Sequence, residues 1–336
     1  MKRRRILTIM LCALLLTGCG RAEQPRDADS VKYPREAVEL VAPAGAGGGY
    51  DLTVRCVADC LEKTKLVSVP LPVTNKPGGG GSVAMEHLED KRGADDILTV
   101  YSPPLCLIHL NGTTKLNYAE NTTPIARLVT DYGCFAVNAD SKYATINDLM
   151  EDLAQDPASV RVGGTSSYGS MDHVQFLKAA KAAGVPDLAQ IEYIGFEDGS
   201  CPAQLMSGKL DVISCGISDI VGLVENGELR VLAITADNRV GNGIVAQMPT
   251  CKEQGINATF YNWRGLFGPP DMPDYALDFW ENTLSEMVQT EEWKRICQEY
   301  GWDMDYLGHE DFQKFLDEVN AEYAELLRDI GLQSAS

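Results

Sequence analysis

Basic residues, histidines and metal-binding motifs are scarce in this 336-residue sequence. Its 29 lysines and arginines face 48 aspartates and glutamates, which gives a formal net charge of −19. Such an acidic chain is expected to be repelled by nucleic acid and by anionic lipid surfaces. The four histidines are scattered, and neither a CxxC nor an HExxH motif occurs. We therefore expect no nucleic-acid partner, no metal and no cofactor.

Signatures of nucleophilic catalysis are also missing. The sequence contains no GxSxG elbow and no evident pairing of a cysteine with a histidine. A hydrolase that uses a Ser/His or Cys/His pair is therefore the interpretation with the least support. Beyond the N-terminal region, no apolar stretch is long enough to cross a membrane. We expect a binding protein and not an enzyme.

The N-terminus has the pattern of a lipoprotein signal peptide. A basic cluster precedes an apolar run, residues 6–16, that is too short to span a bilayer. The motif Leu16-Thr17-Gly18-Cys19 then has the form of a lipobox, in which Cys19 becomes acylated after cleavage. An ordinary secretory signal with an incidental cysteine is the alternative. We expect residues 1–18 to be the signal peptide, residues 19–33 a tether, and the protein to be lipid-anchored at the outer face of the cell membrane or in a periplasm.

The spacing of the remaining eight cysteines is not that of a disulfide-rich scaffold. Cys56 and Cys60 lie four residues apart in a helical pattern. Their Cβ atoms would be ~5–6 Å apart, whereas a disulfide needs ~3.8 Å. We expect both to be core residues.

Residues 38–51 are the most informative stretch. An apolar run ends at Pro43, passes through Gly45, Gly47, Gly48 and Gly49, and enters a helical pattern at Asp51. A strand, a glycine loop and a helix N-terminus in this order present free N–H groups to an anion.

The glycine loop fits two common anion-binding motifs poorly. A Walker loop would end in Lys and Ser or Thr, and a dinucleotide fingerprint would have its third glycine where Tyr50 stands. A binding-protein lobe that holds a small carboxylate and a glycine-rich turn without a ligand both remain open.

Short apolar runs alternate with helical patterns along the chain, which indicates an α/β protein with mainly parallel sheets. Residues 164–170 form a second small-residue loop between a strand and a helix. Crossing segments near residues 133–137 and 231–236 predict a hinged, two-lobed protein. We expect lobe 1 at residues 34–133 and 236–332, and lobe 2 at residues 134–235. The predicted strands are residues 38–41, 67–73, 97–101, 126–129, 134–137, 161–163, 191–194, 210–214 and 229–235; the longest predicted helices are residues 275–288, 291–300 and 311–330.

Several motifs resemble a known family in the same order along the chain. The two glycine loops, Pro43-Ala44-Gly45-Ala46-Gly47-Gly48-Gly49-Tyr50-Asp51 and Asn75-Lys76-Pro77-Gly78-Gly79-Gly80-Gly81, resemble the signature loops of tripartite tricarboxylate transporter substrate-binding proteins, the Bug-type receptors. Met248-Pro249-Thr250-Cys251-Lys252-Glu253-Gln254-Gly255 and Trp263-Arg264-Gly265-Leu266-Phe267-Gly268-Pro269-Pro270 are similar to motifs of its C-terminal half. The resemblance extends from about residue 33 to residue 332.

The resemblance implies a two-lobed receptor with the type II periplasmic-binding-protein (Venus flytrap) fold. Such a receptor captures a small carboxylate, a di- or tricarboxylate or a related organic acid, and delivers it to a membrane permease. By position, the residues implied to bind the ligand are Ala44, Gly45, Gly48 and Tyr50 in loop 1, Gly78, Gly79 and Gly80 in loop 2, and Thr165, Ser166, Ser167, Gly169 and Ser170 in lobe 2.

Five further residues are candidates for the site, four of them with a structural alternative. Asp51 either caps a helix or braces its loop, or it contacts the ligand. Tyr168 either shapes the ligand pocket or packs. His173 either reaches the cleft or is a surface or capping histidine. Asp219 stands where the family commonly has an acid. Arg264 either supports the hinge, pairs with an acid or contacts the ligand.

Two departures from the family pattern bear on the ligand. Tyr50 stands where the family often has threonine, so that a large ring replaces a small hydroxyl. The usual Tyr-Lys-Gly segment reads Tyr193-Ile194-Gly195-Phe196-Glu197-Asp198-Gly199 here, which loses a lysine and gains two acids. The second departure argues against a highly anionic ligand.

Neutral loops can still bind a carboxylate if both lobes contribute. Each charge-assisted hydrogen bond contributes ~1.5–3 kcal/mol, so that four give ~6–12 kcal/mol, and micromolar affinity needs about 8 kcal/mol. We therefore expect closure of the lobes to be coupled to binding. The alternative to a transport receptor is a sensory subunit that serves a membrane signalling kinase. Permease genes next to the gene for this protein would favour the transport receptor.

Overall fold

The computed structural model describes residues 33–196 and 200–332. The predicted signal peptide, the acylation site Cys19 and the predicted tether, apart from Tyr33, lie outside these residues. Within the described part of the chain, no helix combines the length and the apolar character needed to cross a membrane.

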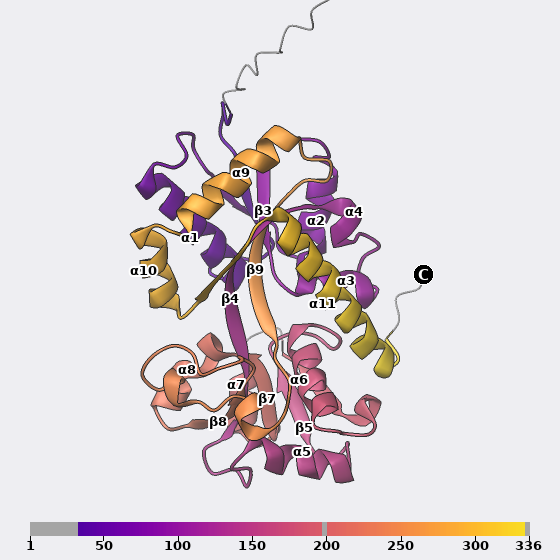
Figure 1. Ribbon diagram of the computed structural model, residues 1–336. Coiled ribbons are helices and arrows are strands. Elements are labelled where there is room, and N and C mark those ends of the chain that lie inside the picture. The colour runs from indigo at the N-terminus through magenta and orange to yellow at the C-terminus, as the bar shows by residue number, and fades with distance from the viewer. Residues whose placement is uncertain (1–32, 197–199, 333–336) are drawn as a thin grey trace, which may run out of the picture. The chain divides into compact units, whose positions relative to one another are not determined.

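One long strand, β4 (Thr123–Asn138), belongs to two sheets. Its first part pairs in antiparallel fashion with β9 (Tyr261–Gly268) and β10 (Asp303–Leu307). Its second part pairs with β7 (Val212–Gly216) and β8 (Leu229–Ile234). Figure 1 shows β4 and β9 running between the upper and lower halves of the drawing. The two halves are α/β lobes, as the sequence predicted.

Lobe 1 contains a mixed sheet in the order β2-β1-β3-β9-β4, with β10 also on β4. Parallel pairs join β1 (Glu39–Ala42) to β2 (Val73–Asn75) and to β3 (Ile97–Tyr101). The helices of this lobe are α1 (Gly49–Thr64), α2 (Ser82–Glu89), α3 (Pro104–Leu110), α4 (Tyr118–Asn121), α9 (Asp274–Met287) and α10 (Glu291–Tyr300).

Lobe 2 contains a sheet in the order β8-β4-β7-β5-β6. Parallel pairs join β5 (Arg161–Gly164) to β6 (Glu192–Gly195) and to β7. The helices of this lobe are α5 (Ile146–Gln155), α6 (Met171–Ala182), α7 (Cys201–Met206) and α8 (Ile217–Glu225).

The C-terminal helix α11 (His309–Asp329) contacts both lobes. It packs against α3 of lobe 1 and against α6 of lobe 2. Two ion pairs of 2.6 Å join α6 to α11, Lys178 with Glu322 and Lys181 with Glu325. Exposed ion pairs of this kind stabilise the folded state by at most about 1 kcal/mol each. These contacts are therefore weak enough to allow the two lobes to move relative to each other.

Local signals in the sequence placed several elements correctly. Thr145 caps α5 by accepting the N–H of Asp148 at 3.2 Å, and the Asp148 carboxylate accepts the N–H of Thr145 in return. This reciprocal pattern satisfies two N–H groups at the start of the helix. The predicted helix at residues 291–300 is confirmed as α10.

The sheets differ from the prediction in two ways. The strands predicted at residues 126–129 and 134–137 are one continuous strand, and β4 runs antiparallel to its partners, so that the sheets are not mainly parallel. Of the strand predicted at residues 67–73, only Val73 belongs to β2. The reason is that Pro70 and Pro72 have no N–H, and each only accepts a hydrogen bond from the β1 side through its carbonyl.

The segment that follows β8 packs on lobe 2. Ala236 and Met248 belong to the apolar cluster of lobe 2, and the side-chain amide of Gln254 donates to the carbonyl of Leu232 at 2.8 Å. This packing favours a lobe boundary near Tyr261, where β9 begins. The boundaries predicted at residues 133/134 and 235/236 stay a prediction.

All eight cysteines in the described part of the chain are buried free thiols. Cys56 and Cys60 lie on the inner side of α1, in the cluster that also contains Val57 and Leu61. Trp263 is fully buried beside Phe312 of α11, with 5.5 Å between the ring centroids.

Candidate functional site

Loop 1 joins β1 to α1 and leaves the start of this helix open. The N-cap residue, Gly48, has an extended backbone and no side chain that could cap the helix. The first N–H groups of a helix have no partner within it, so that those of Gly49, Tyr50 and Asp51 depend on another acceptor. Gly45 and Gly49 are exposed, so that an anion can approach this end of α1.

Asp51 ties loop 1 to loop 2. Its carboxylate accepts the N–H of Gly47 at 2.9 Å, the side-chain amide of Asn75 at 2.8 Å and the Nε–H of Arg55 at 2.9 Å. The Asn75 amide also donates to the carbonyl of Ala44 at 2.9 Å. The hydrogen bond from Arg55 is the main reason that the pKa of Asp51 falls to about 2. Asp51 thus braces the two loops, and direct contact with a ligand stays a prediction.

Tyr50 directs its hydroxyl into lobe 1. The hydroxyl accepts a hydrogen bond from Ser102 at 2.9 Å, and the ring makes an edge contact with Tyr101 at 6.2 Å. Burial raises the pKa of Tyr50 to about 12, so that it stays neutral. The ring therefore packs beside loop 1, with its polar end engaged.

Loop 2 adopts a conformation that only glycine tolerates. Gly78, Gly79, Gly80 and Gly81 have φ values of 134°, 54°, 62° and 110°. A Cβ atom on Gly80 would lie 2.9 Å from the Ile108 side chain. These four residues form a tight turn in which the N–H of Gly81 donates to the carbonyl of Gly78 at 3.0 Å. Gly78, Gly79 and Gly80 are exposed, as a ligand site requires.

In the lobe-2 loop, two of the predicted hydroxyls are used internally. Thr165 donates both its N–H and its hydroxyl to Asp172 at 2.8 Å. The hydroxyl oxygen of Ser166 accepts the N–H of Asp172 at 2.9 Å, and its carbonyl accepts the hydroxyl of Tyr193. These bonds shape the loop before α6 and leave Thr165 and Ser166 less free to bind a ligand.

The outer part of the same loop is accessible. Ser167 and Tyr168 are exposed, and Ser170 is the N-cap residue of α6 without a side-chain cap bond. His173 lies beneath them, 1% exposed, with its ring 4.4 Å from that of Tyr168 and 4.3 Å from that of Tyr193.

The His173 ring supports the lobe-2 loop from below. Its Nδ1 accepts the N–H of Gly169 at 3.0 Å, and burial lowers its pKa to about 3. His173 is therefore neutral at physiological pH. It holds the loop in place in this structure, and contact with a ligand stays a prediction.

Asp172 is a fully buried carboxylate with one unsatisfied oxygen. Its Oδ2 accepts both bonds from Thr165, whereas Oδ1 has no hydrogen-bond partner. Burial raises its pKa from 3.8 to about 6. The folded state therefore binds this proton more tightly than the unfolded state does.

We expect the variant Asp172→Asn to be more stable than the parent at pH 7.5 and not at pH 4. Above its folded pKa of about 6, the buried carboxylate is ionised, which lowers the free energy of unfolding by on the order of 3 kcal/mol. This cost disappears as the pH falls toward 3.8. Urea unfolding at both pH values measures the effect, with the exposed Asp140→Asn as the control. Equal destabilisation of Asp172→Asn at both pH values would contradict it.

The structure brings loop 2 and the lobe-2 loop to the same segment of lobe 1. A Cβ atom on Gly79 would lie 4.0 Å from the Thr113 side chain, and one on Gly169 would lie 3.7 Å from Asn111. Loop 1 is held to loop 2 by Asn75. Three glycine- and serine-rich loops predicted from the sequence therefore lie close to one another, on both lobes.

A charged cluster lies beside loop 1 at the junction of the lobes. The Arg264 guanidinium donates to the carbonyl of Gly49 at 3.0 Å and to the hydroxyl of Thr53 at 2.6 Å. Its Nη2 lies 3.8 Å from Oδ2 of Asp131 on β4. Burial raises the pKa of Asp131 to about 6, and the charge of Arg264 opposes this shift.

Asp219 extends this cluster from lobe 2. It lies in the first turn of α8, and its carboxylate accepts the N–H of Gly216 at 3.0 Å. The surrounding protein raises its pKa by desolvation, although the residue is partly exposed and solvent weakens the effect. Arg264 therefore faces carboxylates from both lobes.

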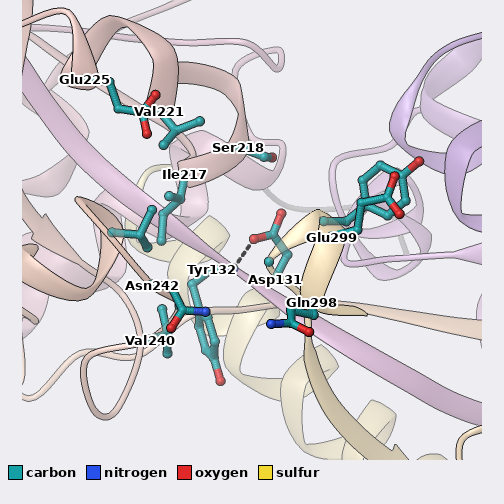
Figure 2. Close-up of a pocket in the computed structure, with 14 residues that line it drawn as sticks. Asp131, Tyr132, Ile217, Ser218, Val221, Glu225, Val240, Asn242, Gln298 and Glu299 are labelled. Carbon is teal, nitrogen blue, oxygen red and sulfur yellow. Dashed lines mark hydrogen bonds between the residues drawn. The ribbon is translucent and has the colours of Figure 1, made fainter. Parts of the chain in front are cut away.

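A cavity of about 410 Å³ adjoins this cluster. It lies between Asp131 and Tyr132 of β4, the start of α8, residues 240–245 and the end of α10 (Figure 2). Its volume is within the range of sites for small molecules. Within the residues that the structure describes, no group of three or more His, Cys, Asp and Glu side chains is placed to hold a metal ion.

Sequence reasoning did not select Asp131 or Asn75 for the site and left the role of Arg264 open. Nothing in the local pattern around Asp131 marks it, because its partner Arg264 is 133 residues away in the sequence. The one signal of this cluster in the sequence was Arg264, a charged residue in the motif of residues 263–270 that otherwise contains only apolar residues and glycine.

Comparison with known proteins agrees with this geometry. The sequence profile of a family described as the tripartite tricarboxylate transporter family receptor (TctC) matches residues 53–332. The chain belongs to this family. The family is one of solute-binding receptors and not an enzyme class.

Individual members and structural neighbours differ widely from this chain in sequence but have a similar fold. A protein of Cupriavidus necator, the UPF0065 protein in the gbd 5′ region, is 23% identical over 337 residues and covers 100% of both chains. The structure of an R. palustris protein with adipate has a TM-score of 0.75 and 19% identity, covering 90% of this chain and 99% of that one. MatC from Rhodopseudomonas palustris with bound malate has a TM-score of 0.69 and 17% identity, covering 88% and 100%.

Proposed function

We propose that this receptor is lipid-anchored outside the cytoplasmic membrane, binds a small carboxylate between its lobes and delivers it to a tripartite tricarboxylate-type permease. The observation that carries the proposal is the open N-terminus of α1, which is braced through Asp51 and Asn75 to the glycine turn of loop 2. Both elements offer main-chain N–H groups, the donors that a carboxylate accepts without a fixed cation.

The family and its structural neighbours support this class of ligand. Adipate and malate, which occupy two of the neighbours, are both small dicarboxylates. The lipobox at Cys19 supports the anchor, because two or three acyl chains hold a protein stably at a membrane.

The lobe-2 loop supplies the second half of the proposed site. Ser167 and Ser170 lie just before α6, whereas Gly169 is buried and donates its N–H to His173, which holds the loop in position. The bonds from this lobe form with the ligand only when the lobes close on it, so that closure is coupled to binding.

Thermal unfolding in the presence of a carboxylate panel tests the proposed function. A ligand at 100 times its Kd stabilises the folded state by ~2.7 kcal/mol, which raises the Tm by several degrees. We expect such a shift with at least one mono-, di- or tricarboxylate or amino acid, and none with the uncharged amide of the same compound. A panel that produces no shift would refute the proposal.

A further inference from the structure

Asp172 joins the lobe-2 loop to the interior of lobe 2. It is the second residue of α6 and is fully buried. Its Oδ2 accepts the N–H and the hydroxyl of Thr165, each at 2.8 Å, and its own N–H donates to the Ser166 hydroxyl at 2.9 Å. Its carbonyl accepts the hydroxyl of Ser214 on β7 at 2.8 Å. The conformation of the loop therefore depends directly on this one residue.

The second carboxylate oxygen of Asp172 has no partner. Oδ1 is buried and makes no hydrogen bond within the part of the chain that the structure describes. An ionised carboxylate at such a position loses its contacts with water and gains no donor in return at this oxygen. A proton bound to Oδ1 removes the buried charge, while Oδ2 continues to accept both bonds from Thr165.

The titratable side chains that face Asp172 from the neighbouring elements are neutral or acidic. They are the Tyr193 phenol on β6, the thiols of Cys201 on α7 and Cys215 on β7, and the Asp219 carboxylate on α8. His173, the next residue of α6, is neutral because burial lowers its pKa to about 3. Asp131 and Asp219 differ from Asp172, because burial raises the pKa of each but the charge of Arg264 opposes that rise.

The proposed solute site brings a second negative charge to the same turn. Ser167 and Ser170, which are proposed to hold a carboxylate, lie just before Asp172 at the start of α6. Two carboxylates at one helix start repel each other, and a like charge raises the pKa of a neighbouring acid. Burial already raises the pKa of Asp172 to about 6. A bound anion therefore moves this pKa further toward neutral pH.

We infer, building on the proposed function, that the receptor takes up a proton on Asp172 when lobe 2 engages the carboxylate of the solute. The proton comes from solvent and binds Oδ1, so that the solute carboxylate meets one negative charge fewer. Asp172 is thus a positioning residue, which acts on the solute through Thr165 and Ser166 and not by contact. The solute and the proton bind together, and their release is coupled in the same way.

Calorimetry in two buffers of different ionisation enthalpy counts the protons taken up. The probes are malate and adipate, together with every member of the carboxylate panel that gives a thermal shift. If the solute raises the pKa of Asp172 from about 6 to about 7, binding at pH 7 takes up roughly 0.4 proton. The affinity should then be about fivefold higher at pH 6 than at pH 8. An uptake below about 0.1 proton for every probe that binds would overturn the inference, and the proposed function would stand.

The variant Asp172→Asn isolates the contribution of this residue. Its amide oxygen can still accept the bonds from Thr165, and it carries no charge at any pH. We expect its proton uptake at pH 7 to fall at least threefold and its affinity to change less than twofold between pH 6 and pH 8. At pH 8 it should bind about tenfold more tightly than the parent, because the repulsion is absent. Asp211→Asn, which removes an acid of lobe 2 that pairs with Arg161 at 2.7 Å, is the control and should keep the proton uptake of the parent.

The outcomes separate the inference from the proposed function. If Asp172→Asn keeps the proton uptake and the pH dependence of the parent, another group binds the proton and the inference is overturned. Weaker binding of this variant at every pH would reduce Asp172 to a structural role and would overturn it as well. If the variant does not fold, the proton count of the parent decides. If no probe binds and the panel gives no thermal shift, the proposed function fails, and the inference fails with it.

Discussion

Replacing Arg264 by leucine is expected to lower the free energy of unfolding by about 3–5 kcal/mol, the usual cost of leaving a buried charge without its partner. Asp131 is 5% exposed, and the guanidinium of Arg264 is the cation that faces it. The variant also leaves the carbonyl of Gly49 and the hydroxyl of Thr53 without their donor. The predicted decrease in the free energy of unfolding therefore has two causes: the Asp131 carboxylate is left without a cation, and loop 1 is left with fewer hydrogen bonds.

Urea denaturation of a small set of variants measures this effect. The double variant with Asp131→Asn should recover a large part of the loss, because the uncompensated charge is then absent. Arg239→Leu is the matched control, since Arg239 forms an exposed ion pair with Glu253 at 3.0 Å and should cost less than about 1 kcal/mol. A loss of less than 1 kcal/mol for Arg264→Leu would show that the cluster does not depend on this arginine.

The variant Gly80→Val is expected to reduce carboxylate affinity more than 100-fold. Gly80 has φ near 62°, which a β-branched residue rarely adopts, and its new Cβ atom would lie 2.9 Å from Ile108. The turn must then rearrange and withdraw its N–H groups from the anion seat. Two lost charge-assisted bonds at ~1.5–3 kcal/mol each correspond to a loss of roughly 100-fold or more.

Calorimetry with the carboxylate that gives the thermal shift measures this loss. Gly184→Val is the control, because Gly184 has φ near 83° in lobe 2 and no atom within 4 Å of a new Cβ. It introduces the same backbone strain away from the predicted loops, and its affinity should stay within threefold of the parent. Parent-like affinity in Gly80→Val would exclude loop 2 from the site.

Much of the fold was accessible from sequence because the signals are local. The capping pair Thr145 and Asp148, the glycines of loop 2 and the apolar periodicity of α10 each act within a few residues. The predicted strand boundaries were wrong where a distant partner decides them. β4 continues through residues 130–132 because β9 pairs with it there, and through Gly133 because β7 does.

The candidate site likewise combines features that local sequence predicts with features that depend on distant residues. Glycine spacing predicted which loops present N–H groups, since a positive φ or a bare helix start is a property of the residues themselves. Glycine spacing could not predict that Thr165 donates its hydroxyl to Asp172 or that the carbonyl of Ser166 accepts the hydroxyl of Tyr193. Nor could it predict that His173 is buried between two tyrosine rings.

The sequence by itself determined the family, the two-lobed α/β class and the positions of the three loops rich in glycine and serine. Only the tertiary structure decided how charge is arranged around them. It brought Asp131, Asp219 and Arg264 together from three separate strands and helices and buried Asp131 nearly completely. The physical reason is that burial and Coulomb interactions depend on distance in space, and the sequence encodes that distance only through the folded sheet.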